Sequence, residues 1–250
     1  MKIAFIGDSF SAYNQYGQEK NHWSYLLAEH FPQHTYYNYS VGGRGYDYYR
    51  LAMLDAKMRG VDVILINRTF NYRTFLHYGD KLEMFEVLTN VDDNYTTLAY
   101  NCHYWYSLHR EKAICNANPP APAHVEKNML NSLAEVSMST AYQTYNANWY
   151  DNVDSLYNFK HIVKLELLDN PNSERIDNAY IQLMKAFDVD QQVQRDKFES
   201  GSEDASDELR KNLLIENGLI ISYEDDHWSP KANKWVFDNY IMPKVVDILS

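Results

Sequence analysis

Short apolar runs alternate with amphipathic stretches along residues 1–70. Residues 3–6 and 61–66 have the length and apolar character of strands buried on both faces, and residues 35–39 are rich in β-forming side chains. Between these runs, apolar residues recur at helical spacing: Trp23, Leu26, Leu27 and Phe31, then Leu51, Leu54 and Met58, with Gly60 closing the second helix. The order strand–helix–strand–helix–strand predicts a parallel sheet with right-handed crossovers.

The middle of the chain, about residues 74–218, is too long for a single crossover. Its patterns predict helices at residues 84–88, 129–145, 178–187 and 208–217. Residues 161–168 fit either a fourth strand or a helix, because periodicity does not separate the two. We therefore expect a helical insertion or cap on an α/β core.

The pattern becomes regular again at residues 219–222, an apolar run that predicts a strand. Ser229 is an expected helix cap with Pro230 in the first turn. A C-terminal helix should follow, with Pro243 inside it or breaking it.

Polar residues follow four of the predicted strands. They are Ser9, the Gly42–Gly43 turn, residues 67–71 and residues 224–227. The carboxyl ends of parallel strands share one edge, which is where open α/β sheets place their sites. Taken alone, Ser9 is either a cap for the following helix or a nucleophile.

Together these residues would suit acyl transfer. His227 could act as the base for Ser9, and a neighbouring carboxylate could orient the imidazole. The backbone N–H groups of Ser9 and Gly43 and the side-chain amide of Asn71 could stabilise an oxyanion.

Composition narrows the functional classes. The chain has 250 residues, a formal net charge of −11 and 45% hydrophobic residues, which predicts a packed core and disfavours nucleic-acid binding. No apolar run is long enough to span a membrane, and the N-terminus starts directly with a strand, so we expect a cytoplasmic protein. Cys102 and Cys115 then fit reduced thiols. The 22 tyrosines suit sugar stacking or protein contacts, or reflect the host's composition.

Four stretches resemble the sequence blocks of the GDSL/SGNH hydrolase superfamily. Residues 7–10, Gly-Asp-Ser-Phe, resemble the first block, and residues 38–43, Asn-Tyr-Ser-Val-Gly-Gly, resemble the second. Residues 69–72, Thr-Phe-Asn-Tyr, stand where that family has Gly-x-Asn-Asp. Residues 225–230, Asp-Asp-His-Trp-Ser-Pro, are similar to the Asp-x-His-Trp variant of the last block, found in acyl esterases and polysaccharide O-acetyltransferase relatives.

The resemblance implies a fold. It covers residues 1–73 and 219–250, and it implies a flavodoxin-like three-layer α/β/α sandwich with a central parallel sheet. The whole chain, 1–250, would be a single domain with a large helical insertion at about residues 74–218.

The resemblance also implies an activity. The chain would hydrolyse an O-acyl ester, such as an O-acetyl group on a carbohydrate, through an acyl-enzyme on Ser9 and without a metal or cofactor. Its partner would be a small-molecule or glycan ester. The alternatives are an O-acyltransferase to a sugar and a catalytically silent domain that binds glycan or protein.

Two departures from the family pattern leave site residues open. The third block has Asn71 but lacks the glycine and aspartate, so Arg68 is a second candidate for stabilising the anion or binding an acidic substrate, or else a surface residue. Either Asp225 or Glu224 could orient His227. The His-Trp-Ser-Pro context favours Asp225, whereas a Ser–His dyad would need neither.

Overall fold

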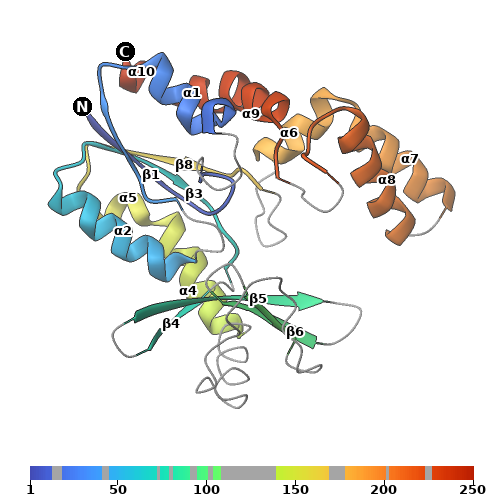
Figure 1. Ribbon diagram of the computed structural model, residues 1–250, viewed down its shortest axis with the longest axis horizontal. Coiled ribbons are helices and arrows are strands. Elements are labelled where there is room, and N and C mark those ends of the chain that lie inside the picture. Colours follow the sequence, from blue (N-terminus) through green and yellow to red (C-terminus); the bar gives the residue numbers. More distant parts are fainter. Residues whose placement is uncertain are drawn as a thin grey trace.

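The fold was analysed in a computed structural model of the full chain (Figure 1). The structure describes residues 1–12, 19–40, 45–71, 74–78, 81–90, 95–100, 104–107, 139–168, 178–200, 203–222 and 227–250.

A four-stranded parallel sheet forms the centre of the molecule (Figure 1). Its strands are β1 (Lys2–Ile6), β2 (Thr35–Asn38), β3 (Val63–Asn67) and β8 (His161–Leu165). They lie in the order β2-β1-β3-β8, and the register pairs Phe5 with both Asn38 and Leu65. Numbered along the sheet's own strands this is the order 2-1-3-4, which is flavodoxin-like and reverses between β1 and β3. The predicted α/β class and parallel sheet are confirmed.

Helices cover both faces of this sheet, as three layers require (Figure 1). On one face Ile3, Phe5 and Leu65 pack in a core with α1, α9 and α10, and α6, α7 and α8 continue that layer. On the other face Ile64 and Ile66 pack against α2, α4 and α5. Neighbouring strand residues thus point to opposite cores, as the pleat dictates. The bounds are α1 (Trp23–His30), α2 (Tyr46–Met58), α4 (Thr140–Asp151), α5 (Val153–Leu156), α6 (Ala179–Ala186), α7 (Val189–Ser200), α8 (Glu203–Glu216), α9 (Pro230–Val236) and α10 (Met242–Leu249).

The fourth strand of the sheet comes from the predicted insertion. β8 pairs with β3 over its whole length, so the open choice at residues 161–168 is decided in favour of a strand. Val163 and Leu165 are buried in the same core as Leu65, which explains why a short apolar run here is extended. Part of the range 74–218 therefore belongs to the α/β core.

The apolar run at residues 219–222 is not a strand of the sheet, contrary to the prediction. It forms only an isolated antiparallel bridge between Ile220 and Trp228, and the Ile221 N–H donates to the His227 carbonyl at 3.0 Å. Leu219 and Ile220 are buried among helices instead. The segment folds back on itself, and His227 lies on the returning side of this fold.

The predicted helix at residues 84–88 is also wrong. These residues lie in β5, in a second, antiparallel sheet whose order is β4-β5-β6-β7. The pairing partner β6 has the sequence Tyr-Thr-Thr-Leu-Ala-Tyr, which is rich in β-forming residues, and cross-strand pairing overrides the helical pattern. The strands are β4 (Thr74–Tyr78), β5 (Lys81–Asn90), β6 (Tyr95–Tyr100) and β7 (Tyr104–Ser107).

The later helices agree better with the sequence. α6 falls within the predicted range 178–187, and α8 covers most of the predicted range 208–217 but begins earlier, at Glu203. α4 begins at Thr140, with the Ser139 hydroxyl accepting from the Tyr142 N–H at 3.3 Å, and residues 129–138 of the predicted helix lie outside the described residues.

The C-terminal helix contains an irregular turn. Ser229 caps it and Pro230 starts it, as predicted, and α9 passes through the π-helical turn η2 (Phe237–Ile241) into α10. Pro243 in α10 has no N–H to donate to the preceding turn, which is consistent with this local widening.

Candidate active site

The turn at residues 7–11, which we call the Ser9 turn, leaves β1 at the edge where the strand order reverses. The Ser11 N–H donates to the Asp8 carbonyl at 3.0 Å, and the Ala12 N–H donates to the Ser9 carbonyl at 3.4 Å. A Cβ on Gly7 would lie 2.5 Å from the Ser11 Cβ and 3.3 Å from the Asn67 Cβ. Only glycine therefore allows the turn to pack this closely on itself and on β3.

Asp8 ties the Ser9 turn to the end of β3. Its Oδ1 accepts from the Phe10 N–H at 3.1 Å and from Asn67 Nδ2 at 3.2 Å, and its Oδ2 accepts from the Thr69 hydroxyl at 3.1 Å. Asn67 in turn accepts from the Leu167 N–H at 3.1 Å, just beyond β8. These bonds link the carboxyl ends of β1, β3 and β8, so Ser9 lies on a part of the sheet edge that is fixed by hydrogen bonds.

The structure brings His227 to the Ser9 turn from the far end of the sequence. Its imidazole stacks on the ring of Phe10, the residue directly after Ser9, with centroids 5.0 Å apart and planes at 27°. Trp228 meets the same Phe10 ring edge-on at 5.2 Å. The structure thus places an imidazole against the turn that carries the Ser9 hydroxyl, and a hydroxyl and an imidazole are the two groups that nucleophilic acyl transfer needs.

A second histidine, which the sequence analysis missed, also touches the Ser9 turn. His22 caps α1: its Nδ1 accepts from the Ser24 N–H at 3.3 Å, so Nε2 carries the proton and donates to the Phe10 carbonyl at 3.2 Å. Burial lowers the pKa of His22 to about 3, and the nearby His227 adds to that shift. His22 is thus a neutral structural group. Histidine is not a usual N-cap, so its position before a helix gave no signal.

Asn71, the predicted oxyanion donor, is buried beyond β3 and held from behind by α4. Its carbonyl accepts from Asn146 Nδ2 at 2.7 Å, and the Asn146 Oδ1 accepts from Arg50 Nη2 at 3.1 Å. The Arg50 guanidinium also pairs with Asp47 at 2.7 Å. The sequence could not show this connection, because α2 and α4 meet only in the fold.

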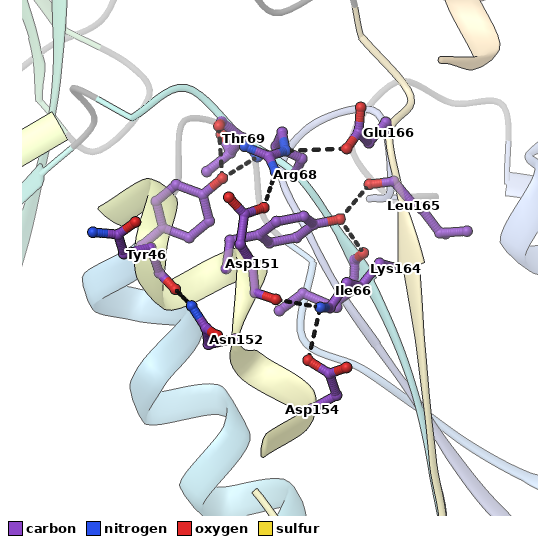
Figure 2. A network of polar contacts seen from close by, with 12 residues as sticks. Tyr46, Ile66, Arg68, Thr69, Asp151, Asn152, Asp154, Lys164, Leu165 and Glu166 are labelled. Atoms are coloured by element: carbon purple, nitrogen blue, oxygen red, sulfur yellow. Dashed lines mark hydrogen bonds and ion pairs between the residues drawn. The ribbon is translucent and has the colours of Figure 1, made fainter. Parts of the chain in front are cut away.

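Arg68 is not a surface residue, which corrects one of the sequence alternatives. Its side chain is 6% exposed, lies against the carboxylates of Asp151 and Glu166, and stacks over the Tyr150 ring at 4.5 Å (Figure 2). Burial lowers the pKa of the guanidinium, but the nearby oxygen atoms of two tyrosines and of the two carboxylates outweigh this effect and raise the pKa. Because two carboxylates already balance its charge, Arg68 is better placed to join β3, α4 and β8 than to receive an acidic substrate.

Three further site candidates, Gly43, Glu224 and Asp225, lie outside the described residues. Among the described side chains, no group of three or more His, Cys, Asp or Glu is placed to hold a metal ion. None of the helices in the described ranges is both long and apolar enough to cross a membrane.

The chain was compared with known proteins. It matches no protein-family profile and no curated protein sequence. Among solved structures, it is similar to a protein of the G-D-S-L family from Desulfitobacterium hafniense DCB-2, for which a lipolytic function is itself only proposed. The sequences are 13% identical, the match covers 95% of both chains, and the TM-score is 0.33.

Proposed function

We propose that the chain is a serine esterase of the SGNH type. The observation that carries this proposal is the stacking of His227 on Phe10, which brings the proposed base next to the turn that holds the proposed nucleophile, Ser9. His22, the other histidine described at this turn, is neutral and uses both ring nitrogens in structural hydrogen bonds.

The reaction would proceed through an acyl-enzyme. The Ser9 hydroxyl attacks the ester carbonyl while His227 takes its proton, and the same imidazolium then protonates the departing alcohol. Water repeats the sequence and releases the acid. The N–H groups of Ser9 and Gly43 and the side chain of Asn71 would stabilise the oxyanion, and Asp225 or Glu224 would orient His227.

The substrate would be a short acyl ester, most simply an O-acetyl group on a carbohydrate. The support is compositional: 22 tyrosines supply flat faces for stacking on sugars and hydroxyls for hydrogen bonding.

A fluorophosphonate probe, which reacts only with activated serines, tests the proposal. We expect the wild type to be labelled, Ser9→Ala to lose the label entirely, and His227→Gln to label at least about 100-fold more slowly. Ser11→Ala is the matched control, because Ser11 is a buried serine in the same turn and should leave labelling intact. An unlabelled wild type, or a label that survives in Ser9→Ala, would contradict the esterase.

Acetate release tests the substrate class. The wild type should release acetate from acetylated oligosaccharides and Ser9→Ala should not. Acetyl groups recovered on an added acceptor sugar, in place of free acetate, would identify a transferase.

A further inference from the structure

The main chain of Phe10 is fixed on both sides. Its N–H donates to Asp8 Oδ1 at 3.1 Å. Its carbonyl accepts two hydrogen bonds, from Trp23 Nε1 at 2.8 Å and from His22 Nε2 at 3.2 Å. Three side chains, one from the Ser9 turn itself and two from the start of α1, thus hold the main chain of this one residue and limit the direction in which its ring leaves the turn.

The Phe10 ring lies face to face with the His227 imidazole. The two rings are nearly parallel, and Trp228 packs edge-on against Phe10 at 5.2 Å, so the Phe10 ring is itself supported. A histidine donates and accepts hydrogen bonds in its own plane. Face stacking therefore restricts rotation of the imidazole and leaves its in-plane nitrogen directions uncovered by Phe10.

The main chain of His227 is anchored separately. Its carbonyl accepts from the Ile221 N–H at 3.0 Å, within the bridge that joins Ile220 to Trp228. The bridge fixes the main chain of the residue, whereas the contact with Phe10 acts on its side-chain torsions.

We infer that Phe10 is a positioning residue, which aligns the His227 imidazole with the nucleophile carried on the same turn. This inference rests on the proposed esterase function. Ser9 and Phe10 are adjacent in the chain, so any shift of the turn moves the nucleophile and the surface that orients its base together. The aromatic face also favours the imidazolium that forms when His227 takes the serine proton.

Two substitutions of Phe10 separate the effect of its aromatic face from the effect of its side-chain volume. Phe10→Tyr keeps the aromatic face, whereas Phe10→Leu keeps an apolar side chain without it. We expect Phe10→Leu to lower kcat for a small ester about 10- to 100-fold with KM within about twofold, because alignment is lost while binding is kept. Phe10→Tyr should restore kcat to within about threefold of the wild type.

Nuclear magnetic resonance tests the contact without any substrate. The imidazole protons of His227, assigned with His227→Gln, should be shifted upfield by the Phe10 face in the wild type and in Phe10→Tyr. They should move downfield in Phe10→Leu. If Phe10→Leu does not fold, Phe10→Met serves in its place, because its flexible side chain fills irregular space.

Tyr36→Leu is the matched control. Tyr36 stacks on Phe5 at 5.7 Å and 20°, in the same core but away from the Ser9 turn, so its loss should lower stability and leave kcat unchanged.

An unlabelled wild type would refute the esterase and with it the role of Phe10. A labelled wild type whose Phe10→Leu variant keeps kcat, or keeps the His227 proton shifts, would refute the role of Phe10 alone.

Discussion

His22 shows how one buried side chain can support the Ser9 turn by hydrogen bonding alone. It is 7% exposed, caps α1 through Nδ1, and holds the Phe10 carbonyl through Nε2. Protonation would turn the accepting Nδ1 into a donor and place a charge in the core. The cost of that charge is the physical reason for its lowered pKa.

This lowered pKa predicts a pH dependence of stability. The unfolded chain binds a proton at His22 near the ordinary pKa of 6.5, whereas the folded protein does not bind it until about pH 3. The free energy of unfolding should therefore fall as the pH is lowered from 6.5 towards 3, by up to about 1.4 kcal/mol per unit from this residue. Urea unfolding at pH 6.5 and 5.0 should show a loss about 2 kcal/mol smaller in His22→Asn than in the wild type. Equal losses in the two proteins would contradict it.

At the scale of elements, the N-terminal strands follow from the sequence and the later ones do not. β1 and β3 are short apolar runs whose two faces are both buried, so their pattern has one interpretation. β8 and the segment at Ile220 are equally short, and only their pairing partners decide whether each becomes a strand of the sheet or folds back in an isolated bridge. For α2, the apolar pattern in the sequence indicated the wrong buried face. Tyr46, Tyr49 and Met53 are buried, while Leu51, Leu54 and Met58 are exposed, because Tyr46 packs on Trp149 and Tyr150.

The contacts around the Ser9 turn likewise include some that the sequence predicts and others that only the fold creates. The sequence could predict that His227 lies near the Ser9 turn, because Ser9 follows Gly7-Asp8 at a strand end and His227 precedes Trp228 at a helix start; its stacking on Phe10 agrees with that. The supporting contacts of His22, Asn146 and Arg50 depend on α1, α2 and α4 packing around the sheet edge, and no local pattern encodes them.

The Arg68 network predicts unequal effects on stability when the Arg68 cation is removed and when the Asp151 carboxylate is neutralised. Glu166 is buried with Arg68, whereas the Asp151 side chain is 44% exposed. Arg68→Met should lower the free energy of unfolding by about 3–5 kcal/mol, because it removes the cation beside a buried carboxylate. Asp151→Asn should cost about 1 kcal/mol or less, because water can solvate the remaining groups. Urea unfolding measures both, and a similar cost for the two variants would show that Arg68 does not stabilise the core through Glu166.

The whole molecule joins a three-layer α/β body to an inserted antiparallel sheet. All four strands of the parallel sheet and both helix layers come from residues 1–71 and 139–250 (Figure 1). The described residues that flank the segment 72–138, Asn71 and Ser139, lie near the same part of α4. The Asn71 carbonyl bonds Asn146, which lies on α4 about 10 Å along the helix from Ser139.

This arrangement predicts that residues 72–138 can be replaced. A Gly/Ser linker of about ten residues can span up to ~33 Å, more than the gap requires. The shortened chain should unfold in one cooperative urea transition, with a lower m-value because less surface is exposed. It should still be labelled at Ser9 by a fluorophosphonate, since the probe needs only the nucleophile and its base. A chain without a cooperative transition would show that the inserted segment is part of the folding core.

The position of β8 in the sequence has a consequence for biosynthesis. β3 cannot pair with β8 until β8 has been synthesised, and roughly ninety residues separate Asn67 from His161. At ~5–20 residues per second, a ribosome needs about 5–20 s to make them. During that time Val-Ile-Leu-Ile-Asn of β3 is an open, apolar sheet edge, the kind of edge through which nascent chains associate. Protection of this edge by a chaperone during synthesis should therefore raise the yield of folded protein.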